Sequence, residues 1–493
     1  MVRRILVIVP LFITPKESEK IKNELNMYAW NGTNIKVIGL QGNIAVNSRA
    51  EAAVATPEFL DLVIKAEKEG YDAVVSYCYV DVGVDAAKEI VKIPVLGPLS
   101  TSATFANMLG QKFSVITVGT TRRIVFPRLR ELQLDSNYVS TRGVDFDKFF
   151  LFSGNIKHVE IMKQALTKEC RKALDDEAHV LIWGCTGFPL AEDLKKKLKV
   201  PIIEGTITLK VAEVLIDLKQ SYKHQCMHSA LHDVKKPNPS EKPKMRIKVL
   251  IPTSTSLGSK SIRKLNGIAN EGTKISVISF KNGPKSIKSA SEAAGVLPFI
   301  IKQAKNAGRE GFNAVIICSF EDIGIEPARE VSDIPVVGPS ESSMLVACML
   351  GKKFSILNND KRVHVALEKT ARKIGVEKQL LSIRSLNGEL EDEKLVSEIH
   401  KVIAEGAETL IVGEVNNPEL FELVHSNVRI PILDPLCAAL KIAEALHSLK
   451  LSHSKLSYPN PALPAYHKAR IKKLTKTLRQ SMFLYENKKA GCR

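Results

Sequence analysis

Short apolar runs rich in β-branched residues alternate with longer helical stretches along the chain. In its first part the apolar runs lie near residues 5–9, 35–40, 73–78, 94–97, 113–117, 180–183 and 201–203. Helical stretches, for example 58–69 and 84–91, fill the gaps between them. The runs are apolar throughout, which is typical of parallel strands covered on both faces. The pattern predicts right-handed βαβ units and an α/β fold.

The same pattern occurs twice because the chain is an internal duplication. "DAVVSYCYVDVGVDAAKEIVKIPVLGP" aligns without a gap with "NAVIICSFEDIGIEPAREVSDIPVVGP", and "MLGQKFSVI" aligns with "MLGKKFSIL". A stretch rich in Lys, Pro and Ser separates the two copies, as expected of a linker. We predict a first copy at 1–218, a linker at 219–245, a second copy at 246–450 and a basic C-terminal tail at 451–493.

Two cysteines of the first copy follow predicted strands. Cys78 comes at the end of the apolar run in "VVSYCYVDVG", and Cys185 comes at the end of the run in "LIWGCTGFP". In parallel α/β sheets, ligands bind beyond the carboxyl ends of the strands. We therefore expect both thiols at this edge, close to helix N-termini, where backbone N–H groups and the helix dipole lower a thiol pKa.

The residues around these cysteines resemble the aspartate/glutamate/hydantoin racemase superfamily, and its hydantoin racemase branch most of all. The resemblance is carried by Cys78 before "DVGVDAAKE", then by "IPVLG", "LGQKFSVIT", "GCTG" and "VPIIEG". It implies that each copy has two pseudo-symmetric flavodoxin-like halves with parallel sheets, with the active site between the halves and no cofactor. Two loops depart from the branch. Val80-Asp81-Val82-Gly83 stands where hydantoin racemases usually have Gly-Asp-Pro-Gly, and Val9-Pro10-Leu11-Phe12 stands where they have Asn-Pro-Asn-Thr.

Carried over residue by residue, the resemblance makes Cys78 and Cys185 the catalytic acid/base pair. One thiolate removes the proton from the stereocentre, and the other thiol returns a proton to the opposite face. Gly184, Thr186 and Gly187 would shape the turn after the strand and offer backbone N–H groups to the developing enolate. The remaining candidate substrate-binding residues follow strands or lie in the loops named above: Pro10, Asp81, Gly83, Thr117 and Thr120.

The expected function is a cofactor-independent racemase or epimerase that acts on a small hydantoin-like or amino-acid-like substrate. Two alternatives stay open at this point. One is a non-catalytic ligand-binding or regulatory protein, which the degenerate second copy suggests. The other is an enzyme resembling the maleate isomerases or the arylmalonate decarboxylases of the same superfamily.

The second copy has lost the pair of thiols. The alignment places Ser319 opposite Cys78 and Glu414 opposite Cys185, and Cys318 lies one residue early on its strand. A hydroxyl without an activating base is a poor proton acceptor. We predict that this copy does not racemise, and that it either packs against the first as an intramolecular pseudo-dimer or binds an effector. Homo-oligomerisation stays open.

Composition and the opening residues indicate which broad class of protein the chain belongs to. The chain is 44% hydrophobic and 25% charged, which is ordinary for globular domains. No apolar run approaches the ~20 residues of a membrane span. The opening "MVRRILVIVPLFITP" lacks a small-residue cleavage site, so we interpret it as a first strand, expect a cytoplasmic location, and expect the eight cysteines to be free thiols.

The net charge of +18 does not indicate a nucleic-acid-binding protein, because lysines are spread along the chain. The densest basic segment, "HKARIKKLTKTLRQ", is interpreted as a solvated helix face. "HQCMHSALH" in the linker carries residue types that bind zinc, but no second ligand cluster accompanies it. We expect no metal site and a small molecule as the partner.

Overall fold

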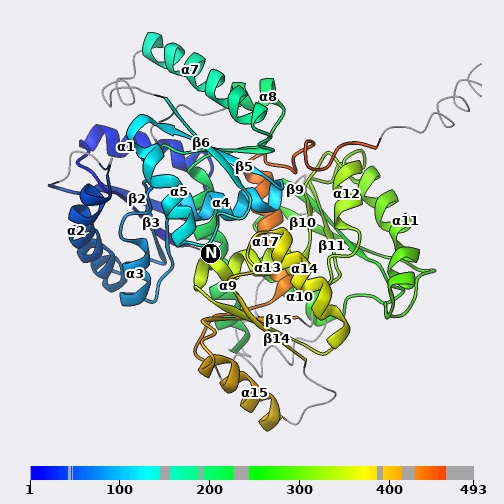
Figure 1. Cartoon of the computed structure of the whole chain (residues 1–493). Helices are drawn as coiled ribbons and strands as arrows, with labels where there is room; N and C mark the ends of the chain where they lie inside the picture. The colour runs from blue at the N-terminus through cyan, green and yellow to red at the C-terminus, as the bar shows by residue number, and fades with distance from the viewer. Residues whose placement is uncertain are drawn as a thin grey trace, which may run out of the picture. The chain divides into compact units, whose positions relative to one another are not determined.

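The computed structural model describes residues 2–42, 46, 48–144, 156–186, 188, 192–226, 244–385, 392–413 and 428–461. Within these residues the strands form four four-stranded sheets, and every strand pair is parallel. Two sheets belong to each copy, and helices connect successive strands (Figure 1). The α/β fold predicted from the apolar runs is confirmed.

The first half of copy one consists of β1 (Arg3–Val9), α1 (Pro15–Asn26), β2 (Thr33–Gly39), α2 (Arg49–Lys68), β3 (Ala73–Ser76), α3 (Val84–Ile90), β4 (Val95–Leu96) and α4 (Pro98–Leu109). The second half consists of β5 (Phe113–Val118), η1 (Gly119–Thr121), α5 (Arg122–Glu131), β6 (Tyr138–Val144), α7 (Ile156–Asp175), β7 (Val180–Trp183), α8 (Glu192–Leu198), β8 (Ile202–Ile203) and α9 (Thr206–Cys226).

Copy two begins with β9 (Met245–Ile251), α10 (Ser259–Ile268), β10 (Thr273–Ser279), α11 (Ala290–Ala307), β11 (Ala314–Ile317), α12 (Ile325–Val331), β12 (Val336–Val337) and α13 (Pro339–Leu350). It continues with β13 (Phe354–Asn358), η2 (Lys361–Val363), α14 (His364–Lys373), β14 (Leu380–Ser385), α15 (Asp392–Ala404), β15 (Thr409–Val412), β16 (Ile432–Leu433) and α17 (Pro435–Ser448).

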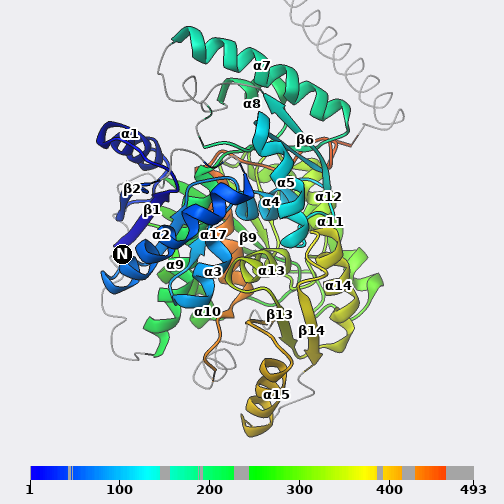
Figure 2. The ribbon, with the colours of Figure 1, turned by 60° about the vertical axis from the view of Figure 1, so that its left-hand side comes forward.

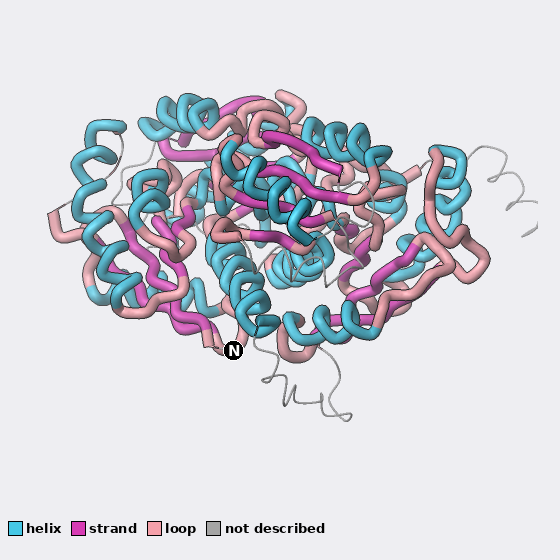
Figure 3. Tube along the Cα trace, turned by 90° about the horizontal axis from the view of Figure 1, so that it is seen from below, coloured by secondary structure: helices cyan, strands magenta, loops and turns pink. Residues whose placement is uncertain are grey.

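All four sheets have the same strand order, in which the first strand of each half lies between the second and the third. The orders are β2-β1-β3-β4, β6-β5-β7-β8, β10-β9-β11-β12 and β14-β13-β15-β16. This is the order of flavodoxin-like sheets, so each copy is a pair of flavodoxin-like halves. Figure 3 shows the strands enclosed between helices, in agreement with the complete burial of β3 and β7.

The sequence pattern missed β6. Its residues, "YVSTRGV", are polar at several positions, and all but Val144 are only half-buried. β6 pairs only with β5 and forms the edge of its sheet. An edge strand does not need apolar residues on both faces, so β6 lacks the continuous apolar run that indicates a buried strand.

Four helices pack together where the two copies meet. Within the copies, α4 contacts α9 and α13 contacts α17. Between the copies, α9 contacts α17 and α4 contacts α13. These helices lie together in the middle of Figures 1 and 2, with the sheets around them. Almost every residue of α4, α13 and α17 is buried, and these helices contribute to one hydrophobic core that both copies share.

A cluster of buried charges crosses this helical interface. The Asp217 carboxylate accepts two hydrogen bonds from the Arg3 guanidinium, at 2.6 and 2.8 Å, and lies 2.7 Å from Nζ of Lys441 in the other copy. All three side chains are at most 5% exposed. Burial alone would raise the pKa of Asp217, but the two cations hold it below its ordinary value. The Trp30 ring lies under the Lys441 ammonium, 4.2 Å from ring centroid to Nζ.

The rest of the cluster repeats in both copies. Lys210 pairs with Glu213 on α9 at 2.8 Å, and Lys441 pairs with Glu444 on α17 at 2.6 Å. The other carboxylate oxygen of each glutamate accepts a backbone N–H from the loop after the first helix of its copy. The donor is Trp30 in copy one and Asn270 in copy two, at 2.8 Å in both cases. The two copies are therefore related by an internal pseudo-symmetry that includes their buried polar contacts.

The chain after α17 also joins the copies. The backbone N–H of Ser454 donates to the Leu109 carbonyl at 2.8 Å, and Ser457 Oγ lies 2.8 Å from Nδ1 of His179. His453 is buried against Val336 of copy two. The beginning of the expected tail thus packs as a strap within the compact unit Met1–Tyr458.

At the expected linker, α9 continues to Cys226 and β9 begins at Met245. Among the described residues, no helix is both long and apolar enough to cross a membrane.

The buried cluster predicts a large effect of removing one partner. We expect Asp217→Ala to lower the free energy of unfolding by about 3–5 kcal/mol, because Arg3 and Lys441 lose their shared anion in a buried site. Lys352→Ala, which breaks the exposed pair with Glu89, should cost about 0–1 kcal/mol.

Urea unfolding monitored by circular dichroism measures both variants. Because the pKa of Asp217 is lowered in the fold, its contribution is present at neutral pH and is lost as the carboxylate becomes protonated. The difference between Asp217→Ala and the wild type should therefore shrink below about pH 4. Equal stability of Asp217→Ala and Lys352→Ala at pH 7 would contradict the assigned role.

Candidate active site

Cys78 lies in a tight turn just beyond β3, where the predicted position at the carboxyl edge is confirmed. Its N–H donates to the Ser76 carbonyl at 2.9 Å, and its carbonyl accepts the N–H of Asp81 at 2.9 Å. A backbone hydrogen bond from Val80 reaches its sulfur. The thiol is half-buried, and α3 begins at Val84 as expected from the sequence.

Asp81 and Gly83 hold this turn in place. The Asp81 carboxylate accepts the N–H groups of Leu99 and Ser100, at 2.9 and 2.8 Å, and so caps the N-terminus of α4. Gly83 has φ of 69°, and a Cβ there would lie 2.5 Å from the Phe59 ring. These contacts give both residues a structural task. Their contact with substrate stays a prediction.

Cys185 lies in the corresponding turn beyond β7. Thr117 is buried at the end of β5, and its Oγ1 donates to the Gly184 carbonyl at 2.7 Å. The Gly184 N–H donates to the Ile116 carbonyl at 2.7 Å. The expectation that Gly184 offers its N–H to an enolate is therefore wrong, because that group completes the pairing of β7 with β5.

The two halves meet beside the thiols. Thr186 Oγ1 donates to the Tyr77 carbonyl at 3.4 Å, which links the Cys185 turn to the residue before Cys78. Cys185 is close enough to Cys78 to raise its pKa as a second acidic group. The structure thus brings the two predicted thiols to one place between the halves.

The expected lowering of the Cys78 pKa is wrong. Burial, together with the neighbouring acidic groups Cys185 and Asp81, raises the pKa of Cys78 to about 12, and the hydrogen bond from Val80 opposes this shift only in part. The expectation rested on the N-terminus of the helix that begins near Val84, but burial of the thiol, together with the acidic neighbours, outweighs what that short helix contributes.

Two buried tyrosines near the thiols were missed by the sequence reasoning. Tyr77 and Tyr79 flank Cys78, and a Cβ added at Gly205 would lie 3.6 Å from a ring carbon of each. Tyr79 shares a hydrogen bond of 3.3 Å with Ser102. Burial raises the pKa of both phenols, and Glu204 and Cys185 contribute as nearby acidic groups. The Tyr-Cys-Tyr run after the strand is the sequence feature that could have identified these two tyrosines.

Glu204 lies at the carboxyl end of β8. Its side chain is 6% exposed and pairs with Lys195 of α8 at 2.6 Å. Among the other predicted residues, Pro10 is buried at the bend after β1, and Thr120 lies in η1. Gly187 lies outside the described residues.

In the described part of copy two, different side chains occupy the equivalent region. Ser319 occupies the position of Cys78, as aligned, and Phe320 takes the place of Tyr79. The Phe320 ring packs on Gly413, where a Cβ would lie 2.3 Å from it. Cys318 is buried, and burial raises its pKa to about 12. Glu414 lies outside the described residues.

Among the described residues, no three His, Cys, Asp or Glu side chains are grouped as metal ligands would be. The linker histidines His228 and His232 lie outside that part of the chain.

Comparison with known proteins identifies one family, whose model matches both copies. A family model described as Asp/Glu/Hydantoin racemase matches residues 32–210 and 247–443. A hydantoin racemase of Pseudomonas sp. is 31% identical over 234 residues, covering 45% of this chain and 94% of that protein. A hydantoin racemase of Paenarthrobacter aurescens is 30% identical over 235 residues, covering 45% of this chain and all of that protein.

Among solved structures, an allantoin racemase from Klebsiella pneumoniae matches with 24% identity and a TM-score of 0.41, covering 45% of this chain and 96% of that one. The sequence relatives and the family model together support an isomerase of the racemase type.

The raised pKa of Cys78 predicts slow, strongly pH-dependent alkylation. We expect its rate with iodoacetamide to rise about tenfold per pH unit from about pH 7 to 10 without levelling, because thiolate is the reacting form. Peptide mass spectrometry measures the Cys78 adduct directly. Free cysteine, with a pKa near ~8.5, is the control and should level off above about pH 9. A Cys78 rate that levels off at the same pH as free cysteine would contradict the effect of burial.

Proposed function

The chain belongs to the Asp/Glu/hydantoin racemase family, and we propose that its first copy is a cofactor-independent racemase or epimerase that uses Cys78 and Cys185. The proposal is supported by the positions of the two thiols in turns at the carboxyl ends of β3 and β7, one from each half, and by the hydrogen bond from Thr186, beside Cys185, to the carbonyl of Tyr77, beside Cys78. Racemisation through two bases needs one acid/base group on each face of a single carbon. Two halves that each supply one thiol meet this need.

The proposed substrate is a small hydantoin-like or amino-acid-like compound whose C–H is flanked by a carbonyl. The relatives named hydantoin racemase support the cyclic ureide as the first compound to test. The carbonyl matters because it takes up the electron pair of the broken C–H bond as an enolate.

In the proposed reaction, one thiolate removes the proton from the stereocentre, and the S–H bond forms as the C–H bond breaks. The electron pair moves into the carbonyl to give the enolate. The opposite thiol then donates its proton to the other face of the carbon and becomes a thiolate. The enzyme ends with the two protonation states exchanged, and the reverse reaction restores them.

The pKa of Cys78 decides the resting state of this pair. With a pKa of about 12, Cys78 is a thiol at neutral pH, so it serves as the proton donor in the direction for which Cys185 is the base. For the opposite direction, the thiolate of Cys78 is stabilised by the Val80 N–H. The positioning groups are Thr117, which fixes the turn before Cys185, and Thr186, which joins it to Tyr77.

Copy two supports the first copy and does not share its reaction. A serine stands opposite Cys78, and Phe320 packs against Gly413 where the two halves of copy two meet. Its contribution is the packing of α13 and α17 against α4 and α9.

Deuterium exchange tests the proposal. We expect the wild type to exchange the C–H of 5-substituted hydantoins in D₂O, as followed by NMR. Cys78→Ala and Cys185→Ala should each reduce racemisation by at least about 10²-fold, because either substitution removes one of the two proton-transfer groups. Cys318→Ala is the matched control, since this buried cysteine lies next to the position in copy two that corresponds to Cys78, and it should leave the rate unchanged.

Other results would redirect the assignment. Equal rates for the wild type and Cys78→Ala would exclude the two-thiol mechanism. Absence of exchange with hydantoins and amino acids, in a protein that binds them, would favour the ligand-binding alternative. Release of CO₂ from a malonate, or isomerisation of maleate, would favour the two related enzyme types.

A further inference from the structure

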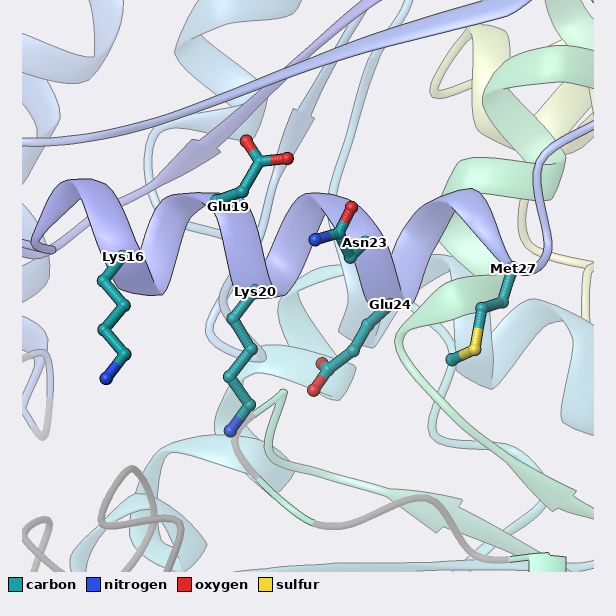
Figure 4. A pocket seen from close by; sticks show the side chains of 6 residues that line it. All are labelled: Lys16, Glu19, Lys20, Asn23, Glu24 and Met27. Atoms are coloured by element: carbon teal, nitrogen blue, oxygen red, sulfur yellow. The ribbon is translucent and has the colours of Figure 1, made fainter.

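The surface hollow that runs along α1 is separate from the two thiols. It is lined by side chains of that helix and of its C-cap alone, from Lys16 to Met27, as Figure 4 shows. No described residue of the turns that carry Cys78 and Cys185 lines it. Selection among substrates at the proposed active site therefore depends on the side chains that flank the thiols.

Tyr79 follows Cys78 directly, and its ring lies against α4. The phenol oxygen shares a hydrogen bond of 3.3 Å with Oγ of Ser102, and both side chains are buried. A buried phenol usually needs such a partner. A ring carbon of Tyr79 also lies 3.6 Å from a Cβ built on Gly205, so the missing side chain at Gly205 leaves room beside the ring. The hydrogen bond and this room together keep the ring beside α4.

In copy two, the ring at the corresponding position lies elsewhere. The gapless alignment places Phe320 opposite Tyr79 and Gly413 opposite Gly184. The Phe320 ring reaches from its own half to the other half, where a Cβ added at Gly413 would overlap three of its carbons. The ring of copy two therefore occupies the space between the turns that correspond to the two thiol turns.

The hydroxyl group is one clear difference between these two rings. Ser343 is the counterpart of Ser102, but its Oγ donates to the carbonyls of Pro339 and Ser340, at 2.8 and 3.0 Å, within its own helix. Phe320 has no hydroxyl with which to bind Ser343. Nothing polar holds its ring on the interface helix, and the ring packs across the two halves instead.

In copy one, the corresponding space is free of this ring. The atoms nearest to a Cβ built on Gly184 all come from its own half, from Val115, Ile116 and Thr117. The stereocentre of a hydantoin is carbon 5, which lies between the two thiols in the proposed reaction. The substituent on carbon 5 is then close to the residues next to the thiols, which include Gly184 and Tyr79.

We propose that Tyr79 is a specificity-determining residue, whose hydrogen bond with Ser102 keeps its ring away from Gly184 and leaves room for a bulky substituent on carbon 5 of the substrate. This inference rests on the proposed function and adds selection by size to it. Without the hydrogen bond, the ring is free to take the position that Phe320 has in copy two. A methyl substituent needs little of the room that the ring would then fill, whereas a benzyl substituent needs most of it.

The test compares 5-methylhydantoin with 5-benzylhydantoin as substrates. We expect Tyr79→Phe to lower kcat/KM for the benzyl compound by at least about tenfold and to leave that for the methyl compound within about twofold, because a filled pocket rejects by size. Ser102→Ala leaves the buried phenol without its partner and should act in the same direction. A general distortion of the site would lower both rates together.

Tyr138→Phe is the matched control. It removes another contact of 2.9 Å between a phenol and a hydroxyl in copy one, that of Tyr138 with Thr141 on β6. This variant should keep the wild-type ratio of the two kcat/KM values. An equal change of that ratio in Tyr138→Phe and Tyr79→Phe would contradict a specific role of Tyr79.

A crystal structure of Tyr79→Phe separates this inference from the proposed reaction. We expect the ring at position 79 in van der Waals contact with Gly184. A ring that stays beside Ser102, or an unchanged preference between the two hydantoins, would overturn the inference. The proposed function fails separately, if the wild type racemises neither compound. The size preference is then measured from the affinities of both hydantoins for the wild type and for Tyr79→Phe by NMR titration, and absence of binding to the wild type would also overturn the inference.

Discussion

The buried ion cluster between α9 and α17 is the contact on which the arrangement of the two copies depends. Apolar helices could slide against each other at small cost, but buried charges are tolerated only where each finds its partner. Asp217 requires Arg3 from its own copy and Lys441 from the other, and Trp30 covers the cations. Since α9 follows β8, the same contacts fix the helix that begins just after Glu204, at the edge of the candidate site. The interface thereby supports the chemistry without taking part in it.

The parts of the fold that are buried on both faces could be predicted from the sequence, because parallel strands leave continuous apolar runs. β6 could not, since an edge strand with half-buried polar residues carries no such signal. The duplication was visible as an alignment, and the expected tandem of two racemase-like domains is confirmed by the family model that matches both. The packing of the two copies could not be predicted from the sequence, because it depends on buried lysines and glutamates, which are residue types that usually lie on the surface.

In the candidate site, too, some features could be predicted from the local sequence and others depend on the whole fold. The edge rule for parallel sheets located Cys78 and Cys185, because strand ends are a property of local sequence. Burial is a property of the whole fold, so the direction of the Cys78 pKa shift was predicted wrongly. The same holds for the Gly184 N–H, which pairs within the sheet.

The charge cluster contains positions at which the two copies differ. Arg3 is opposite Met245 at the start of the corresponding strand, and Asp217 is opposite Ser448, whose hydroxyl accepts the Trp30 indole N–H at 3.0 Å. In an assembly of identical subunits, every substitution appears on both sides of the twofold axis at once. An aspartate needed by one side would be imposed on the other, where a serine is required. Covalent fusion removes that constraint, so each side of the interface can change alone, and the two copies of this chain are free to diverge while still fitting together.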